Sequence, residues 1–147
     1  ARHIAMDPFE EDFDVGATAA LMRRKRSAVK TVLLNQSVVS GIGSIYADEA
    51  MWAARVAPWQ PANTLSQETA VDLLEASRAV MERALAQGGT SFDSLYVNVN
   101  GASGYFARSL NAYGRAGEPC ARCGDAIAKT VVNQRSSYYC PTCQNPT

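Results

Sequence analysis

The sequence predicts a mainly α-helical domain followed by a small β-hairpin that carries all the cysteines. Two observations predict this fold class. Apolar residues recur at helical spacing through much of residues 14–113. The four cysteines form two C-x₂-C pairs that flank two short, strand-like segments near the end of the chain. We therefore expect three parts: a linker over 1–13, a helical domain over 14–114, and a cysteine-bearing domain over 115–147.

The first segment shows neither helical nor strand periodicity, and Pro8 interrupts it. The chain opens on Ala1 without a starting Met. We therefore expect residues 1–13 to be the remnant of an interdomain linker.

Two short helices are expected next. Residues 15–26 combine apolar Ala and Leu residues with a basic end, which suits a helix C-terminus electrostatically. Ser27 is the expected N-cap of a second helix over 28–35.

A third helix is expected from Ile45 to Val56, after a turn that contains Gly41 and Gly43. Two glycines between helices favour a plain packing turn, but a helix that starts directly after them also offers free N–H groups to a phosphate.

The clearest helix begins after Ser66 as N-cap and ends before the glycines at 88 and 89. Its expected core stripe recurs at a spacing near 3.6 residues and consists of Ala70, Leu73, Leu74, Ser77, Met81, Ala84 and Leu85. A polar loop over 91–106 then leads into a short helix expected near 104–110.

The charge of the chain is balanced overall but unevenly placed. The 147 residues carry 14 basic and 14 acidic side chains, for a formal net charge of zero. Residues 17–35 nevertheless hold five cations and no acid. Such a cluster is suited to phosphates, although a solvated helix face is an equal alternative. No apolar run reaches the roughly 20 residues that cross a bilayer, so we expect a cytoplasmic protein without a membrane partner.

The four cysteines predict one structural zinc ion. Each C-x₂-C pair can present two thiolates from one tight turn, and two pairs complete a tetrahedral S₄ site. Two disulfides or a redox-active pair are the alternatives, and a reducing cytoplasm disfavours the disulfides. The expected ligands are Cys120, Cys123, Cys140 and Cys143.

Between the two pairs, residues 126–132 and 136–139 are expected to form a hairpin that turns near Asn133 and Gln134. Arg135 follows the turn, where its guanidinium could bind a phosphate; a solvated turn residue is the alternative.

Three segments, in order, resemble the C-terminal half of bacterial formamidopyrimidine-DNA glycosylase. They are LLNQSVVSGIGSIYADEAMW, then GGTSFDSLYVNVNGASGYFARSLNAYGRAGEPC, then the Cys₄ segment. The resemblance runs from about His3 to Gln144. It implies a helix–two-turn–helix DNA-binding domain followed by a zinc finger, which together bind duplex DNA that contains an oxidised base. It also implies base-excision repair: an N-terminal proline amine attacks the sugar, and β- and δ-elimination nick the strand.

The chain departs from that pattern at its start, where Ala1-Arg2 stands in place of Pro-Glu. We therefore expect a monomeric DNA-binding part that lacks the N-terminal catalytic domain and binds DNA without excising a base.

The resemblance also implies site residues. Arg26 and Lys30 match basic positions that contact phosphates, and Arg135 matches the finger arginine assigned to δ-elimination. A guanidinium stays protonated in proteins, which favours a phosphate-holding role for Arg135 over proton donation. Gly43, Ser44 and Tyr46 complete the expected DNA-binding set.

At position 44 the family usually has Asn, so the shorter Ser44 is expected either to loosen a phosphate contact or only to cap the helix.

Two alternatives remain open from the sequence. One is a non-catalytic zinc-ribbon module that binds nucleic acid. The other is the endonuclease VIII branch, which acts on oxidised pyrimidines. The loop over 94–106 resembles the one that covers an extruded purine, so it favours 8-oxoguanine and formamidopyrimidine as the targets.

Overall fold

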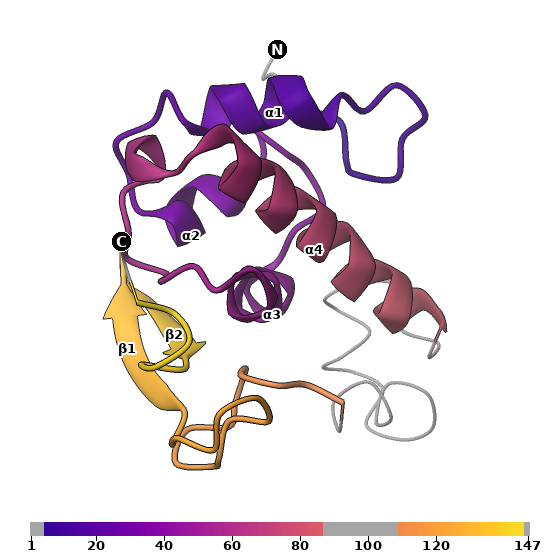
Figure 1. Cartoon of the computed structure of the whole chain (residues 1–147). Helices are drawn as coiled ribbons and strands as arrows, with labels where there is room; N and C mark the ends of the chain where they lie inside the picture. Colours follow the sequence, from indigo (N-terminus) through magenta and orange to yellow (C-terminus); the bar gives the residue numbers. More distant parts are fainter. Residues whose placement is uncertain (1–4, 87–108, 146–147) are drawn as a thin grey trace.

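The computed structural model describes residues 5–86 and 109–145. Four helices are grouped together, and a two-stranded hairpin lies beside the third of them (Figure 1). The helices are α1 (Val15–Met22), α2 (Val29–Leu33), α3 (Ser44–Ala54) and α4 (Gln67–Ala86), with a 3-10 turn η1 (Ala62–Thr64) before α4. The strands are β1 (Ala128–Val132) and β2 (Arg135–Tyr139), which pair antiparallel. The predicted fold class, a mainly helical domain followed by a Cys₄ hairpin, is confirmed.

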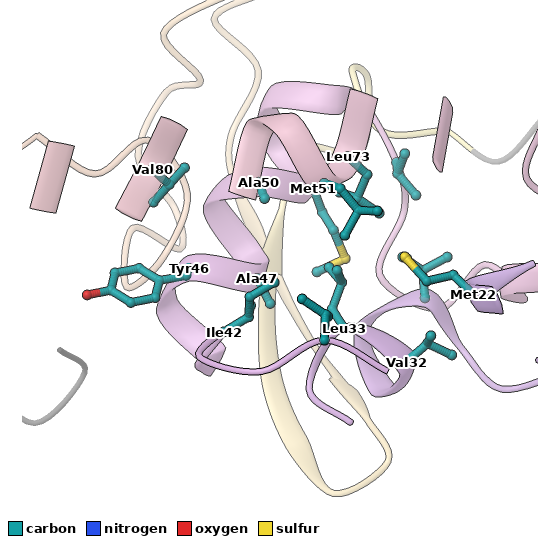
Figure 2. Packing of buried hydrophobic residues seen from close by; sticks show 14 of the residues in the cluster. Met22, Val32, Leu33, Ile42, Tyr46, Ala47, Ala50, Met51, Leu73 and Val80 are labelled. Atoms are coloured by element: carbon teal, nitrogen blue, oxygen red, sulfur yellow. The ribbon is translucent and has the colours of Figure 1, made fainter. Parts of the chain in front are cut away.

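Helix α3 lies at the centre of the molecule. Every residue from 45 to 52 is buried, so this helix has no solvent-facing side along most of its length. Leu33 of α2, Met51 of α3 and Leu73 of α4 meet in the core (Figure 2). Full burial of such a side chain contributes about 1.5–3 kcal/mol relative to leaving it exposed. On another side, α3 packs against β2, and this contact joins the two parts of the chain.

Helix α4 begins as the sequence predicts. The hydroxyl of Ser66 accepts a hydrogen bond from the amide of Thr69 at 3.1 Å, which is an N-cap. The predicted core stripe is buried except at Leu85, which is 47% exposed, so that part of the prediction is wrong. A step of 100° per residue places Val80 and Leu85 on opposite borders of the stripe, and the packing of α4 covers only Val80. The predicted stop at the glycines and most of the predicted helix near 104–110 lie outside the described residues.

The first two helices are shorter than predicted. α1 ends at Met22, before the basic residues, and Arg23 bonds instead to Leu65 O and to the side chain of Gln67. Ser27 is not the N-cap of α2. The amide of Val29 donates to Gln60 O at 2.8 Å, so a neighbouring loop supplies the partner that a cap would have supplied.

The predicted third helix ends two residues early and the predicted hairpin is confirmed. Arg55 adopts the left-handed conformation (φ 63°) directly after Ala54, which ends α3. In the hairpin, Asn133 (φ 48°) and Gln134 (φ 68°) are both left-handed, as a two-residue turn of type I′ requires. None of the described helices is long and apolar enough to cross a membrane.

Candidate nucleic-acid interface and metal centre

The four predicted ligand cysteines converge at the base of the hairpin. Their sulfur atoms all lie within 4.8 Å of one another. The Sγ atoms of Cys120 and Cys143 are 3.9 Å apart, and those of Cys123 and Cys140 are 3.5 Å apart. A disulfide needs about 2.05 Å, so the cysteines are not cross-linked.

This donor set fits one structural zinc ion. Four thiolates at tetrahedral spacing are a closed Zn²⁺ site with no position left for a substrate. Burial raises the pKa of the Cys120 thiol, but hydrogen bonds from the Cys123 amide and the Trp52 indole outweigh it and lower that pKa to about 6. The Asp125 amide lowers the pKa of Cys123, but burial and hydrogen bonds with the other cysteine sulfurs raise it to about 12. Zinc binding therefore has to displace a proton from Cys123, because the thiolate is the form that binds metal.

The metal centre also contacts the end of α3. The indole Nε1 of Trp52 donates to Cys120 Sγ at 3.4 Å. Arg122, between the first two cysteines, stacks on the Trp52 ring at 3.7 Å and donates to Trp52 O. Its positive charge therefore lies near the negative end of α3, over the ring whose N–H donates to Cys120. The finger is thus attached to the helical domain through its own metal site.

A second feature is a hollow between the N-terminus of α3 and the tip of the hairpin. It has a volume of about 240 Å³ and is lined by Leu34, Gln36, Ile42, Gly43, Ser44 and Arg135. Ser44 is the first residue of α3, and the first N–H groups of a helix lack partners inside the helix. Arg135 is exposed and opens β2. The arrangement places a guanidinium opposite a helix N-terminus, which is suited to an anion.

The two glycines before α3 have different roles. Gly41 has a left-handed backbone (φ 88°), and its amide donates to the side chain of Gln36 at 3.2 Å. Gly43 is extended (φ −94°) and is the N-cap residue, without a side chain to cap the helix. Ser44 therefore does not cap α3, and its hydroxyl makes no hydrogen bond to another described residue.

Lys30 lies behind this hollow and not on its surface. Its side chain is 1% exposed, and its Nζ lies 2.9 Å from Asp48 Oδ1. Burial lowers the pKa of Lys30, with Asp48 opposing and Arg135 adding to that shift. Burial likewise raises the pKa of Asp48 to about 6, against the opposing charge of Lys30. The expected phosphate contact from Lys30 is therefore not available in this structure.

Arg26 and Tyr46, two further residues of the expected DNA-binding set, differ in their exposure to solvent. Arg26 is exposed in the segment between α1 and α2, where it can meet a ligand. Tyr46 belongs to the core and is 4% exposed, and burial raises the pKa of its hydroxyl (Figure 2). The expected loop contact over 94–106 lies outside the described residues.

A second buried acid, Glu49, organises the connection to the finger. The carboxylate of Glu49 accepts hydrogen bonds from the amides of Asn111, Ala112 and Tyr113 at 2.7–2.9 Å. It therefore fixes the segment that leads from the helical domain to the first cysteine pair. The charges of Asp48 and Glu49 inside an otherwise apolar helix were a signal in the sequence that both needed buried partners.

Comparison with protein families gives two matches that together span most of the chain. Residues 4–95 match the formamidopyrimidine-DNA glycosylase H2TH domain. Residues 117–146 match a zinc finger found in FPG and IleRS. The chain belongs to the formamidopyrimidine-DNA glycosylase family. The chain corresponds to the C-terminal H2TH and zinc-finger region of that family.

Relatives and solved structures agree with this assignment. The formamidopyrimidine-DNA glycosylase of Corynebacterium urealyticum is 62% identical over 143 residues, which are 97% of this chain and 50% of that protein. The Lactococcus lactis enzyme bound to DNA with an AP site superimposes with a TM-score of 0.84 at 32% identity, covering 97% of this chain and 50% of that one. The same enzyme bound to FAPY-dG DNA gives 0.83 at 32% identity, over 95% and 50%.

The chain thus spans about half the length of the curated relatives that it matches.

Proposed function

We propose that this chain is the DNA-binding part of a base-excision repair glycosylase and AP lyase that acts on oxidised purines in duplex DNA. The hollow between Ser44 and Arg135 is the observation that carries the proposal. One domain contributes a helix N-terminus and the other contributes an arginine, so a single phosphate would contact both. Solved relatives of this fold are bound to DNA with an AP site or a FAPY-dG lesion.

In the proposed complex, Arg135 binds the phosphate beside the lesion, and the backbone at Gly43 and Ser44 receives the same group. Arg26 adds a second, exposed phosphate contact. Because most of the affinity comes from phosphates, binding should weaken steeply as salt rises. When full-length enzyme nicks the strand, Arg135 would stabilise the charge that develops on the departing phosphate.

We further propose that these 147 residues bind DNA but do not excise a base by themselves, since they span half the length of the relatives. Release of 8-oxoguanine from a lesion-containing duplex by the purified chain would contradict this part.

The phosphate site is tested by titrating a duplex that contains an abasic-site analogue and measuring fluorescence anisotropy. Arg135→Ala should weaken binding about tenfold and reduce the salt slope by about 1. Ser44→Asn should strengthen it, because the longer amide reaches further into the hollow. Lys129→Ala, which removes an exposed cation from the same hairpin, is the matched control and should have a smaller effect. Equal losses for Arg135→Ala and Lys129→Ala would show that only net charge matters.

A further inference from the structure

The buried pair of Lys30 and Asp48 joins three elements directly behind the proposed phosphate site. Lys30 comes from α2 and Asp48 from α3. The Nζ of Lys30 lies 2.9 Å from Asp48 Oδ1, and it donates to Ser136 O at 2.8 Å and to Ser137 Oγ at 2.9 Å on β2. Two of the three ammonium donors therefore make hydrogen bonds to β2, and the charge is paired with Asp48. These contacts hold the Lys30 ammonium inside the fold, away from the exposed surface at Arg135.

Each member of the pair leads to a residue that lines the hollow. The hydroxyl of Ser137 donates to Arg135 O at 3.2 Å, so one side chain separates Lys30 from the backbone of Arg135. Asp48 lies one helical turn after Ser44, and its Oδ2 accepts from the amide of Tyr138 at 3.1 Å. The pair thus fixes the strand that begins at Arg135 against the helix that begins at Ser44.

We propose that Lys30 and Asp48 are positioning residues for phosphate binding, which hold Arg135 opposite the first turn of α3 without touching DNA themselves. This inference rests on the proposed phosphate site. It also gives a reason for a buried charge on α2, at a position where the resemblance implies a DNA contact.

An apolar contact in the same place would not fix the position of β2 against α3 in the same way. Hydrophobic burial is non-directional, whereas the ammonium and the carboxylate make hydrogen bonds with defined geometry. Buried ion pairs seldom add net stability compared with apolar residues of similar size, so a positional role is the better account of this one. The hairpin has few core residues of its own to fix its angle against α3.

A double-mutant cycle tests the proposal. Lys30→Met with Asp48→Leu removes both charges at once, which avoids leaving one of them buried and unpaired. Ser137→Ala is a milder second variant that keeps the ion pair but breaks its link to Arg135. Each is combined with Arg135→Ala, and the dissociation constant is measured with a duplex that contains a tetrahydrofuran abasic-site analogue. Zinc content and thermal unfolding identify the variants that are folded.

Each positioning variant should weaken binding about tenfold when Arg135 is present and by less than about twofold when it is absent. The control Lys129→Met makes the same Lys→Met exchange at an exposed site of the hairpin, and its effect should be equal in both backgrounds. Equal losses from Lys30→Met/Asp48→Leu in both backgrounds would mean that Lys30 contacts phosphate directly, and would overturn the proposal. Folded variants with unchanged affinity would overturn it as well.

A different result is expected if the proposed phosphate site itself is wrong. In that case Arg135→Ala alone would leave the affinity unchanged, whatever the Lys30 and Asp48 variants do.

Discussion

The helical domain and the hairpin are stabilised in different ways. The helical domain has a large apolar cluster that draws on α1 to α4. Among the described residues, the buried members of the hairpin cluster are Trp52, Ala112, Cys120, Ile127 and Cys140, and the largest of them, Trp52, belongs to α3. The helical domain therefore has a core of its own, whereas the hairpin depends on thiolate–metal bonds and on its contact with α3. Small domains with so little core generally need such a metal.

The largest expected effect is the loss of zinc. Chelation under reducing conditions should unfold the hairpin, because metal-ligand bonds supply most of its folding free energy. The helical domain should stay folded. Hydrogen exchange checks this directly: amides of β1 and β2 should lose protection, and amides of α4 should keep it. Protected strand amides in the reduced, metal-free protein would show that the hairpin has a sufficient core.

The next effect concerns the apolar core of the helical domain. Leu73 is fully buried, and Leu73→Ala should lower the free energy of unfolding by about 2–5 kcal/mol through lost burial and a residual cavity. The matched control is Leu85→Ala on the same helix, whose side chain is exposed and which should change stability by less than about 0.5 kcal/mol. Urea unfolding measures both. Similar losses for the two variants would contradict the packing described for α4.

A smaller effect is expected at the contact between the two regions. Trp52→Phe keeps an aromatic ring but removes the N–H that donates to Cys120 Sγ. Hydrogen bonds to metal ligands are commonly worth 10–100-fold in metal affinity, so zinc binding should weaken by about tenfold. Competition with a chromophoric chelator measures the change. Trp59→Phe is the control, because the Trp59 ring meets Tyr139 edge-to-face and its N–H donates to no cysteine sulfur among the described residues. A similar loss in both variants would assign the effect to packing alone.

The smallest effect is the pH dependence of the contact through Asp48. A raised pKa means that the folded protein binds this proton more tightly than the unfolded chain does. The stability from Asp48 is therefore fully present below pH 3.8 and is lost as pH rises through about 6. The free energy of unfolding is compared between the unaltered protein and Asp48→Asn. The advantage of the unaltered protein should increase by about 1 kcal/mol when pH is lowered from 7.5 to 5.5.

The charged groups that set this shift are Lys30 from α2 and Glu49 from α3, and Arg135 from β2 acts on Lys30. Urea unfolding of both proteins at the two pH values gives the difference. A difference that stays constant between pH 5.5 and 7.5 would show that Asp48 is already ionised throughout this range.

Local features of the fold were predictable from the sequence. The N-cap at Ser66 and the turn at Asn133-Gln134 depend on residues a few positions apart, and both are confirmed. The cysteine cluster was predictable for the same reason, because each C-x₂-C pair forms its own turn. The prediction for Ser27 was wrong because Gln60, from a distant loop, accepts the hydrogen bond of the first α2 amide. The prediction for Leu85 was wrong because no neighbouring element of the described structure buries its side chain.

The sequence alone determined the helical class and the metal ligands, because both depend on short-range spacing, and it indicated the family through three segments that resemble it. Only the tertiary structure decided what Lys30 does. A lysine in a basic segment predicts a surface contact, but its partners are Asp48, 18 positions later, and Ser137, 107 positions later. No local sequence pattern predicts the contacts of Lys30 with Asp48 and Ser137. These contacts depend on how α2, α3 and β2 pack, and a buried ammonium is stable only where packing supplies its partners.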